Sequence, residues 1–234
     1  MLRIIRYFLP LLCFSFLSAY NLKKLNEEIS DLDISTINIK GCSGVDQIIK
    51  IVFGEENKIE IEKQSENIIL NEDNVYFNSE FDELYFFLPS PLKDKGIIKY
   101  LVTLKGMPGI INIKDYSILK CEDFYSEEYS EECFDISVKN NCSVYLKGRT
   151  KEQLIEIDNT SLYDASEFET KVTRIYFEDF LTKIDHNGKI HINASDLLQI
   201  FNDYKTFIPV LYAIKPERLE FSGRYFVLDR FNKK

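Results

Sequence analysis

The chain has 234 residues, of which 45% are hydrophobic and 29% are charged, a composition that excludes a wholly disordered protein. Its 29 Lys and Arg against 38 Asp and Glu give a formal net charge of −9, so the phosphate backbone of a nucleic acid is an unsuitable partner. Only two histidines are present, which leaves little material for a histidine-based catalytic centre or zinc site.

Residues 1–19 have the order of a secretory signal peptide. Two arginines come first, an apolar run from Tyr7 to Leu17 follows, and the small residues Ser18 and Ala19 close the segment. The apolar run is shorter than the roughly 20 residues that a membrane-spanning helix needs. We therefore expect export to the periplasm, the medium or the cell envelope. Leu17 occupies the −3 position, where a small residue is preferred, so an uncleaved membrane anchor stays open.

Removal of that segment leaves four cysteines, an even number that favours disulfides in an exported protein. Cys121 and Cys133 bracket the acidic sequence CEDFYSEEYSEEC, and we expect them to bond to each other. Cys42 and Cys142 then form the second pair. Other pairings, and free buried thiols, stay open.

The rest of the chain alternates between apolar and polar residues. Residues 20–33 are polar with sparse leucines and predict a linker or a short helix. Beyond them come runs such as INIK at 37–40 and IEIE at 59–62, whose period of two predicts half-buried strands. We divide this part into an N-terminal β unit, 34–105, and a series of coils with a C-terminal cap, 106–234.

An internal repeat occupies much of the second half. Four segments each contain a strand, a polar corner of Asp, Asn, Ser or Thr, and a second short strand: residues 134–148, 153–168, 172–188 and 189–201. A repeat of this length suits one turn of a β-solenoid. In this register the residues that end the first strands point inward and lie above one another: Val138, Ile157, Phe177 and Ile192. The alternative is an antiparallel β-sandwich.

These residues resemble the putative auto-transporter adhesin family with the head GIN domain, exported bacterial proteins with a right-handed β-helix-like fold. The resemblance runs from Ile34 to the C-terminus, through NKIEIEKQSENI at 57–68, LYFFLPSP at 84–91 and the closing segment at 208–227. It implies an adhesin-like solenoid and offers no catalytic residues. The chain departs from the family where Asn-Thr-Ser, at 159–161, replaces the Gly-Ser pairs common at coil corners.

The acidic loop between Cys121 and Cys133 is the candidate interaction site. It matches no calcium-loop motif and contains no glycine, so a solvated loop is the simplest interpretation. The functional interpretation is a partner-binding tip formed by Tyr125, Glu127, Glu128, Tyr129, Glu131 and Glu132.

We therefore expect a secreted or periplasmic β-solenoid that binds or scaffolds, with no catalytic activity, cofactor or metal. Its partner is an unidentified protein or cell-surface molecule, and its oligomeric state stays open. The alternative is an exported polysaccharide-acting enzyme on the same scaffold, because glycoside cleavage needs two carboxylates. The outward acids available for that are Asp158, Asp164, Glu178, Asp179 and Asp185.

Overall fold

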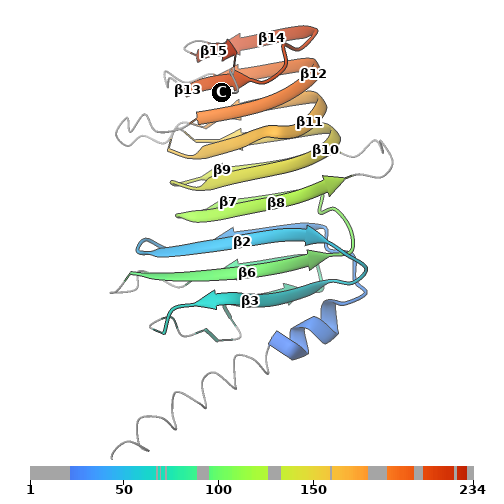
Figure 1. Cartoon of the computed structure of the whole chain (residues 1–234), viewed down its shortest axis with the longest axis vertical. Coiled ribbons are helices and arrows are strands. Elements are labelled where there is room, and N and C mark those ends of the chain that lie inside the picture. The colour runs from blue at the N-terminus through green and yellow to red at the C-terminus, as the bar shows by residue number, and fades with distance from the viewer. Residues whose placement is uncertain are drawn as a thin grey trace, which may run out of the picture.

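The computed structural model describes residues 22–66, 68, 70–71, 73–88, 95–125, 133–158, 160–178, 189–202, 208–223 and 226–230. Most of these residues lie in strands, and within these ranges the one helix covers residues 22–29 (Figure 1). The predicted all-β class is therefore confirmed. The expected signal segment, 1–19, lies outside the described residues. No helix in the described ranges is long and apolar enough to cross a membrane.

One sheet of fifteen strands curls around the core and forms two walls (Figure 1). Wall A contains, in spatial order, β4 (Val75–Asn78), β5 (Glu83–Phe87), β1 (Thr36–Lys40), β7 (Ile110–Lys114), β9 (Cys133–Lys139), the second halves of β10 (Ser143–Ile157), β11 (Leu162–Phe177) and β12 (Lys189–Asn202), and β14 (Arg218–Gly223). Wall B contains β3 (Lys58–Gln64), β6 (Gly96–Leu104), β2 (Val45–Phe53), β8 (Ser117–Tyr125), the first halves of β10 to β12, β13 (Ile208–Tyr212) and β15 (Phe226–Arg230).

The strand pairing is that of a solenoid-like stack. Among the described pairs, β3 runs antiparallel to β6 and β4 antiparallel to β5, whereas the others are parallel. Parallel neighbours cannot be joined by hairpins, so the chain passes from wall A to wall B and back, one coil above another. This pairing excludes the antiparallel sandwich.

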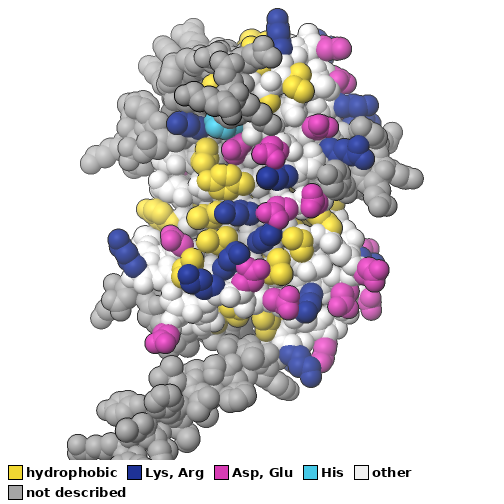
Figure 2. Space-filling view, viewed as in Figure 1, with side chains coloured by type: hydrophobic (Ala, Val, Ile, Leu, Met, Phe, Trp, Pro, Cys, Tyr) yellow, Lys and Arg dark blue, Asp and Glu magenta, His cyan; other side chains and the backbone are white. Residues whose placement is uncertain are grey.

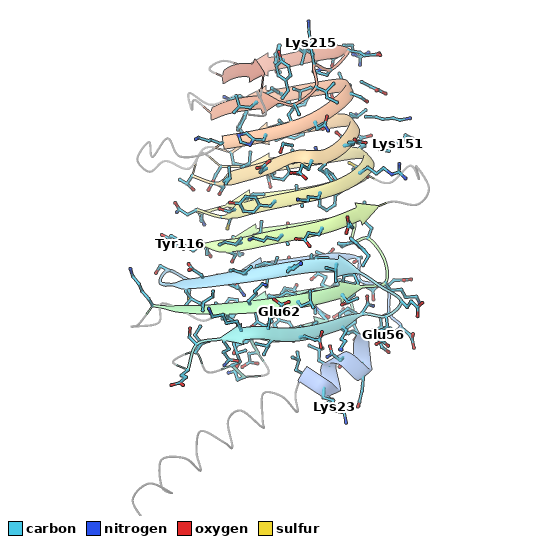
Figure 3. The ribbon with its side chains drawn as sticks, viewed as in Figure 1. Lys23, Glu56, Glu62, Tyr116, Lys151 and Lys215 are labelled. Atoms are coloured by element: carbon cyan, nitrogen blue, oxygen red, sulfur yellow. The ribbon has the colours of Figure 1, made fainter. Side chains whose placement is uncertain are left out.

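The two edges of the stack turn by different means. On one edge, where Figure 3 shows Tyr116, β7 is joined to β8 through Asp115 and Tyr116 with φ of 59° and 66°. Asn140 and Asn141 have the same left-handed conformation, at φ 62°, between β9 and β10. Asn and Asp tolerate this region best, which explains the polar corners. On the opposite edge, near Lys151 in Figure 3, β10 bends from wall B to wall A without interruption.

Columns of aliphatic side chains fill the space between the walls. On wall A, residues on successive rungs (the strand levels of the stack) are directly paired and at most 1% exposed: Ile37, Ile111, Ile136, Ile155, Ile175 and Ile200. Every second residue of each strand takes part, which is the period-two pattern of the sequence. The hydrophobic effect therefore acts along a continuous core rather than within separate coils.

The predicted register of the repeat is right for three coils and wrong for the fourth. Val138 pairs with Ile157, and Ile157 pairs with Phe177, as expected. Ile192 is buried but belongs to wall B, where it pairs with Tyr212. The reason is that the polar corner at residues 193–196 is a bend within β12, which leads from wall B to wall A, whereas the corners of the first two segments are turns from wall A to wall B. The fourth segment is therefore half a coil out of phase with them.

The helix over 22–29 covers the N-terminal end of the stack. The Asn26 side chain donates to the Ile59 carbonyl oxygen at 2.9 Å and accepts from the Ile59 N–H at 2.8 Å. It thus takes the place of a neighbouring strand on the outer edge of β3. Asn57 donates to the carbonyl oxygens of Ile29 and Leu32, which closes the end of the helix. Edge strands invite pairing with other chains, and these contacts protect this one.

The first coil along the chain is not the first in the stack. β1 lies between β5 and β7, and β2 lies between β6 and β8. The predicted units 34–105 and 106–234 are therefore joined by continuous pairing on both walls.

Candidate binding face

The expected disulfides are absent: among the described residues Cys42, Cys121, Cys133 and Cys142 are free thiols. Cys42 follows β1 and Cys142 follows β9, and β7 lies between these strands. Two strand spacings amount to roughly 9.6 Å. A disulfide joins Cα atoms less than about 7 Å apart. Cys42–Cys142 is therefore too far apart to bond without movement of the backbone.

The pair Cys121–Cys133 fails for a similar reason. Cys121 pairs with Leu146 on wall B, whereas Cys133 pairs with Glu152 on wall A. These two positions of β10 lie on opposite sides of its bend, again beyond disulfide reach. Burial raises the pKa of the Cys142 thiol to about 12 and that of Cys133 to about 11. Their thiolates are correspondingly scarce near neutral pH.

The predicted partner-binding tip cannot be placed. Glu127, Glu128, Tyr129, Glu131 and Glu132 lie outside the described residues. Tyr125 is the last residue of β8, and its side chain is not described.

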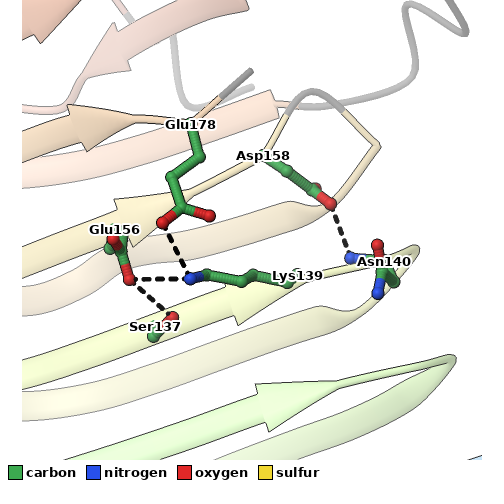
Figure 4. Close-up of polar contacts among 6 residues, drawn as sticks. All are labelled: Ser137, Lys139, Asn140, Glu156, Asp158 and Glu178. Atoms are coloured by element: carbon green, nitrogen blue, oxygen red, sulfur yellow. Dashed lines mark hydrogen bonds and ion pairs between the residues drawn. The ribbon is translucent and has the colours of Figure 1, made fainter. Parts of the chain in front are cut away.

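The outward acids are scattered, with one exception. Asp158 is buried in a corner, where it accepts hydrogen bonds from the N–H groups of Asn140 and Thr160. Asp164 lies 3.5 Å from His191 across wall B. Asp179 and Asp185 lie outside the described residues. Glu178 lies beside Glu156, and the two carboxylates bind Nζ of Lys139 at 2.8 and 3.0 Å (Figure 4).

The pKa values of these two carboxyl groups diverge. The pKa of Glu156 lies below its usual range because its carboxylate hydrogen-bonds to Glu178, Lys139 and Ser137. The pKa of Glu178 is raised because its protonated form donates to Glu156 and because the group is partly buried. Burial alone would lower the pKa of Lys139, but its hydrogen bonds to the two acids outweigh burial and raise it.

The outer face of wall A is hollowed beside this cluster. One hollow of about 470 Å³ lies over β5, β1, β7 and β9, and a second of about 310 Å³ continues over β7, β9, β10 and β11. The two share Asn112 and Ser137 as lining residues, so they form one groove. A third hollow, about 820 Å³, is lined by residues of the helix and of β3, which include charges of both signs.

One row of side chains explains the groove. Successive rungs on the outer face of wall A place the following residues in register: Tyr76, Tyr85, Asn38, Asn112, Ser137, Glu156, Tyr176 and Phe201. Large aromatic side chains stand at both ends, and shorter polar ones lie between them. The depression is therefore a direct result of side-chain size along the row. We call this row the groove row.

The aromatic residues at each end stack on one another. Tyr76 and Tyr85 have ring centroids 4.7 Å apart and planes 6° apart, and Tyr176 and Phe201 have centroids 4.5 Å apart and planes 8° apart. These distances match the spacing between strands, so the rings stack along the row. From Tyr85 to Tyr176 there are five steps of about 4.8 Å, roughly 24 Å.

The floor of the groove offers hydrogen-bonding groups. Asn112 donates to the side-chain oxygen of Asn38 at 2.9 Å, and Ser137 donates to Glu156 at 2.9 Å. The amide N–H groups of Asn38 and the side-chain oxygen of Asn112 have no hydrogen-bond partner among the described residues. Aromatic ring faces with amides and a hydroxyl between them can bind a ligand that has both C–H faces and hydroxyl groups.

The lysines form a second row along one side of the groove. Lys40, Lys114 and Lys139 are paired in register, and all three line the hollow of about 470 Å³, whose described lining contains no carboxylate. Lys40 lies over the Phe87 ring at 5.0 Å. We call these three residues the lysine row.

Wall B differs, as Figure 2 shows: lysines and acids intermingle over its outer face. Lys50 binds Glu122 at 2.8 Å, and Lys147 binds Glu167 at 3.2 Å, each across neighbouring rungs. Charge on that face is largely compensated locally.

Sequence reasoning missed the groove residues. Their shared row depends on β1, β4 and β5 lying next to β7, which strand alternation does not reveal. One sequence signal was available: the segment INIK occurs twice, at 37–40 and at 111–114. In each copy an outward asparagine, Asn38 or Asn112, lies between two buried isoleucines.

Comparison with known proteins gives a fold likeness. A Bacteroides fragilis crystal structure, called a putative adhesin, matches with a TM-score of 0.52 and 9% identity over 86% of this chain and 93% of that chain. At that identity the likeness concerns the fold alone. No protein-family model matches the chain, and neither does a curated protein. The resemblance to the head GIN family therefore has no family match in its support.

Proposed function

We propose that this chain is an exported, adhesin-like binding protein that holds a saccharide chain along the groove of wall A. The observation that carries the proposal is the groove row, in which short polar residues lie between stacked aromatic pairs. The order of residues 1–19 supports export, and the fold shared with a protein called a putative adhesin is consistent with the role.

The chemistry of the groove favours a saccharide over a peptide. An aromatic face binds the apolar face of a sugar ring, while side-chain amides and hydroxyls exchange hydrogen bonds with its hydroxyl groups. The strand spacing of about 4.8 Å is close to the advance of an extended pyranose chain per sugar. Several sugars can therefore meet equivalent rungs between Tyr85 and Tyr176. A peptide binding to a sheet usually pairs with an exposed edge, and this groove lies on a face.

Removal of single aromatic rings tests this proposal. Tyr85→Ala and Tyr176→Ala should each weaken binding of oligosaccharides about five- to tenfold, because one stacking contact is lost. Tyr145→Ala is the matched control, since Tyr145 is an exposed tyrosine on wall B. Titration calorimetry with neutral and acidic hexasaccharides measures the effect. If no oligosaccharide binds, or if Tyr145→Ala weakens binding as much as the groove variants, the proposal is wrong.

The alternative, cleavage of a polysaccharide, has one observation in its favour. Glu156 and Glu178 are paired carboxyl groups with divergent pKa values, and Glu156 lines the groove. Lys139, however, binds both carboxylates and so occupies the space that a glycosidic bond would need. We therefore propose binding without cleavage. Product analysis after prolonged incubation with the bound oligosaccharide distinguishes the two functions, because cleavage that is lost in Glu178→Gln would establish the enzyme.

A further inference from the structure

The lysine row is an exception to the way this protein arranges charge. Elsewhere, opposite charges meet across neighbouring rungs, as in Lys50–Glu122 and Arg174–Glu152. Even where Lys50 lies opposite Lys120, Glu122 binds the first of them. Like charges directly opposite one another in a sheet destabilise it. With 38 Asp and Glu in the chain, acidic residues are available to be placed opposite lysines, so a row of three lysines is unexpected.

The three lysines are not equivalent. Lys139 is compensated by Glu156 and Glu178. Lys40 contacts an aromatic ring, which leaves its positive charge intact. Lys114 is exposed, and no ion pair joins it to another described residue. Two uncompensated charges on adjacent rungs thus face the part of the groove next to Tyr85 and Tyr76.

From this we infer that the saccharide bound in the groove is acidic, and that Lys40 and Lys114 bind its carboxylate or sulfate group while the Tyr85 ring stacks on the same sugar or its neighbour. This inference rests on the proposed function and specifies its ligand class. Two ammonium groups about one strand spacing apart can both reach a single anionic group. The second hollow, lined by Asp135 and Glu156, would repel an acidic group, so the charged sugar binds at the Tyr85 end.

The test uses three hexasaccharide probes with the full mature protein: oligogalacturonate, its methyl ester, and a sulfated neutral oligosaccharide. Oligogalacturonate should bind at least about tenfold more tightly than its ester, because a charge-assisted contact is lost on esterification. Raising the salt concentration should weaken binding of the acid and leave binding of the ester unchanged. Binding of the sulfated probe alone would retain the inference and identify sulfate as the anionic group.

Variants separate this inference from the proposed function. Lys114→Gln should remove most of the preference for the acid, whereas Lys120→Gln, on wall B, should retain it. Tyr85→Ala should weaken binding of both acid and ester. Equal binding of acid and ester, with Tyr85→Ala weakening both, would overturn the acidic ligand and keep the saccharide groove. If none of the three probes binds, both the acidic ligand and the saccharide groove are wrong. If a single-stranded oligonucleotide binds more tightly than any of the saccharides, the ligand of the groove is a phosphate polymer instead.

Discussion

Two adjacent residues of β11 provide a direct test of the register. Phe177 points into the core, where it is 4% exposed and pairs with Ile157 on the rung below. Tyr176 points outward, is 37% exposed and stacks on Phe201. Phe177→Ala and Tyr176→Ala remove rings of nearly equal size from opposite faces of the same strand.

The expected losses of stability differ severalfold. Phe177→Ala leaves a cavity between the walls, and buried Phe→Ala substitutions cost about 3–5 kcal/mol. For a chain of this length, each kcal/mol corresponds to about 2–4 °C, so the midpoint of thermal unfolding should fall by roughly 6–20 °C. Tyr176→Ala removes a half-exposed ring and one stacked pair, at a cost of about 1 kcal/mol. Its midpoint should therefore fall by about 2–4 °C.

Urea titration followed by circular dichroism gives the free energies, and thermal melts give the midpoints. The reasoning depends on the difference between the variants, because a shift of one residue exchanges the inner and outer faces along the whole strand. Equal losses, or a larger loss for Tyr176→Ala, would refute the register and with it the stacked columns.

Three further predictions follow from contacts outside the core. Asn26→Ala leaves the N–H and carbonyl groups of Ile59 without partners, so the free energy of unfolding should fall by about 1–3 kcal/mol. Because this substitution also exposes the edge of β3, sedimentation should show association that depends on protein concentration. In native protein a thiol reagent should modify the half-buried Cys133 first, and the buried Cys42, Cys121 and Cys142 only after unfolding without reductant. Detection of a Cys121–Cys133 or Cys42–Cys142 disulfide would contradict the pairing of the strands. The hydrogen bond to Glu83 raises the pKa of Tyr85 to about 12, so its contribution to stability is complete below pH about 10 and is lost between about 10 and 12. Absorbance titration should show this ionisation moving towards pH 10 in Glu83→Gln, and no change there would exclude the bond as its cause.

Much of the fold was predictable because local patterns record it. The alternation in 37–40 and 59–62 identified real strands, and Ile37, Ile39 and Ile59 are buried as their positions required. Polar corners also carried information, since left-handed turns select Asn and Asp. The polar corner at residues 193–196 was also identified, but sequence alone did not show that it bends from wall B to wall A, so Ile192 was assigned to the wrong wall.

The binding groove was less predictable because it depends on distant neighbours. Asn38 and Asn112 are 74 positions apart in the sequence, yet their side chains are hydrogen-bonded. Pairing across such distances follows from the order of coils in the stack, which single-strand patterns do not encode. For the cysteines, closeness in the sequence was misleading. Cys121 and Cys133 are only 12 residues apart, which suggested a disulfide, but they lie on different walls.

The position of the first coil constrains how this protein can fold. β1 lies between β5 and β7 on wall A, and β2 lies between β6 and β8 on wall B. β2 therefore gains its neighbours only when residues 96–104 and 117–121 have been synthesised. Growth of the stack on the ribosome therefore cannot proceed coil by coil from the N-terminus. Such non-local pairing slows folding, since chain entropy is lost before the contacts are gained. During that interval the apolar face of β2 stays exposed, which makes this stage the most prone to misassembly.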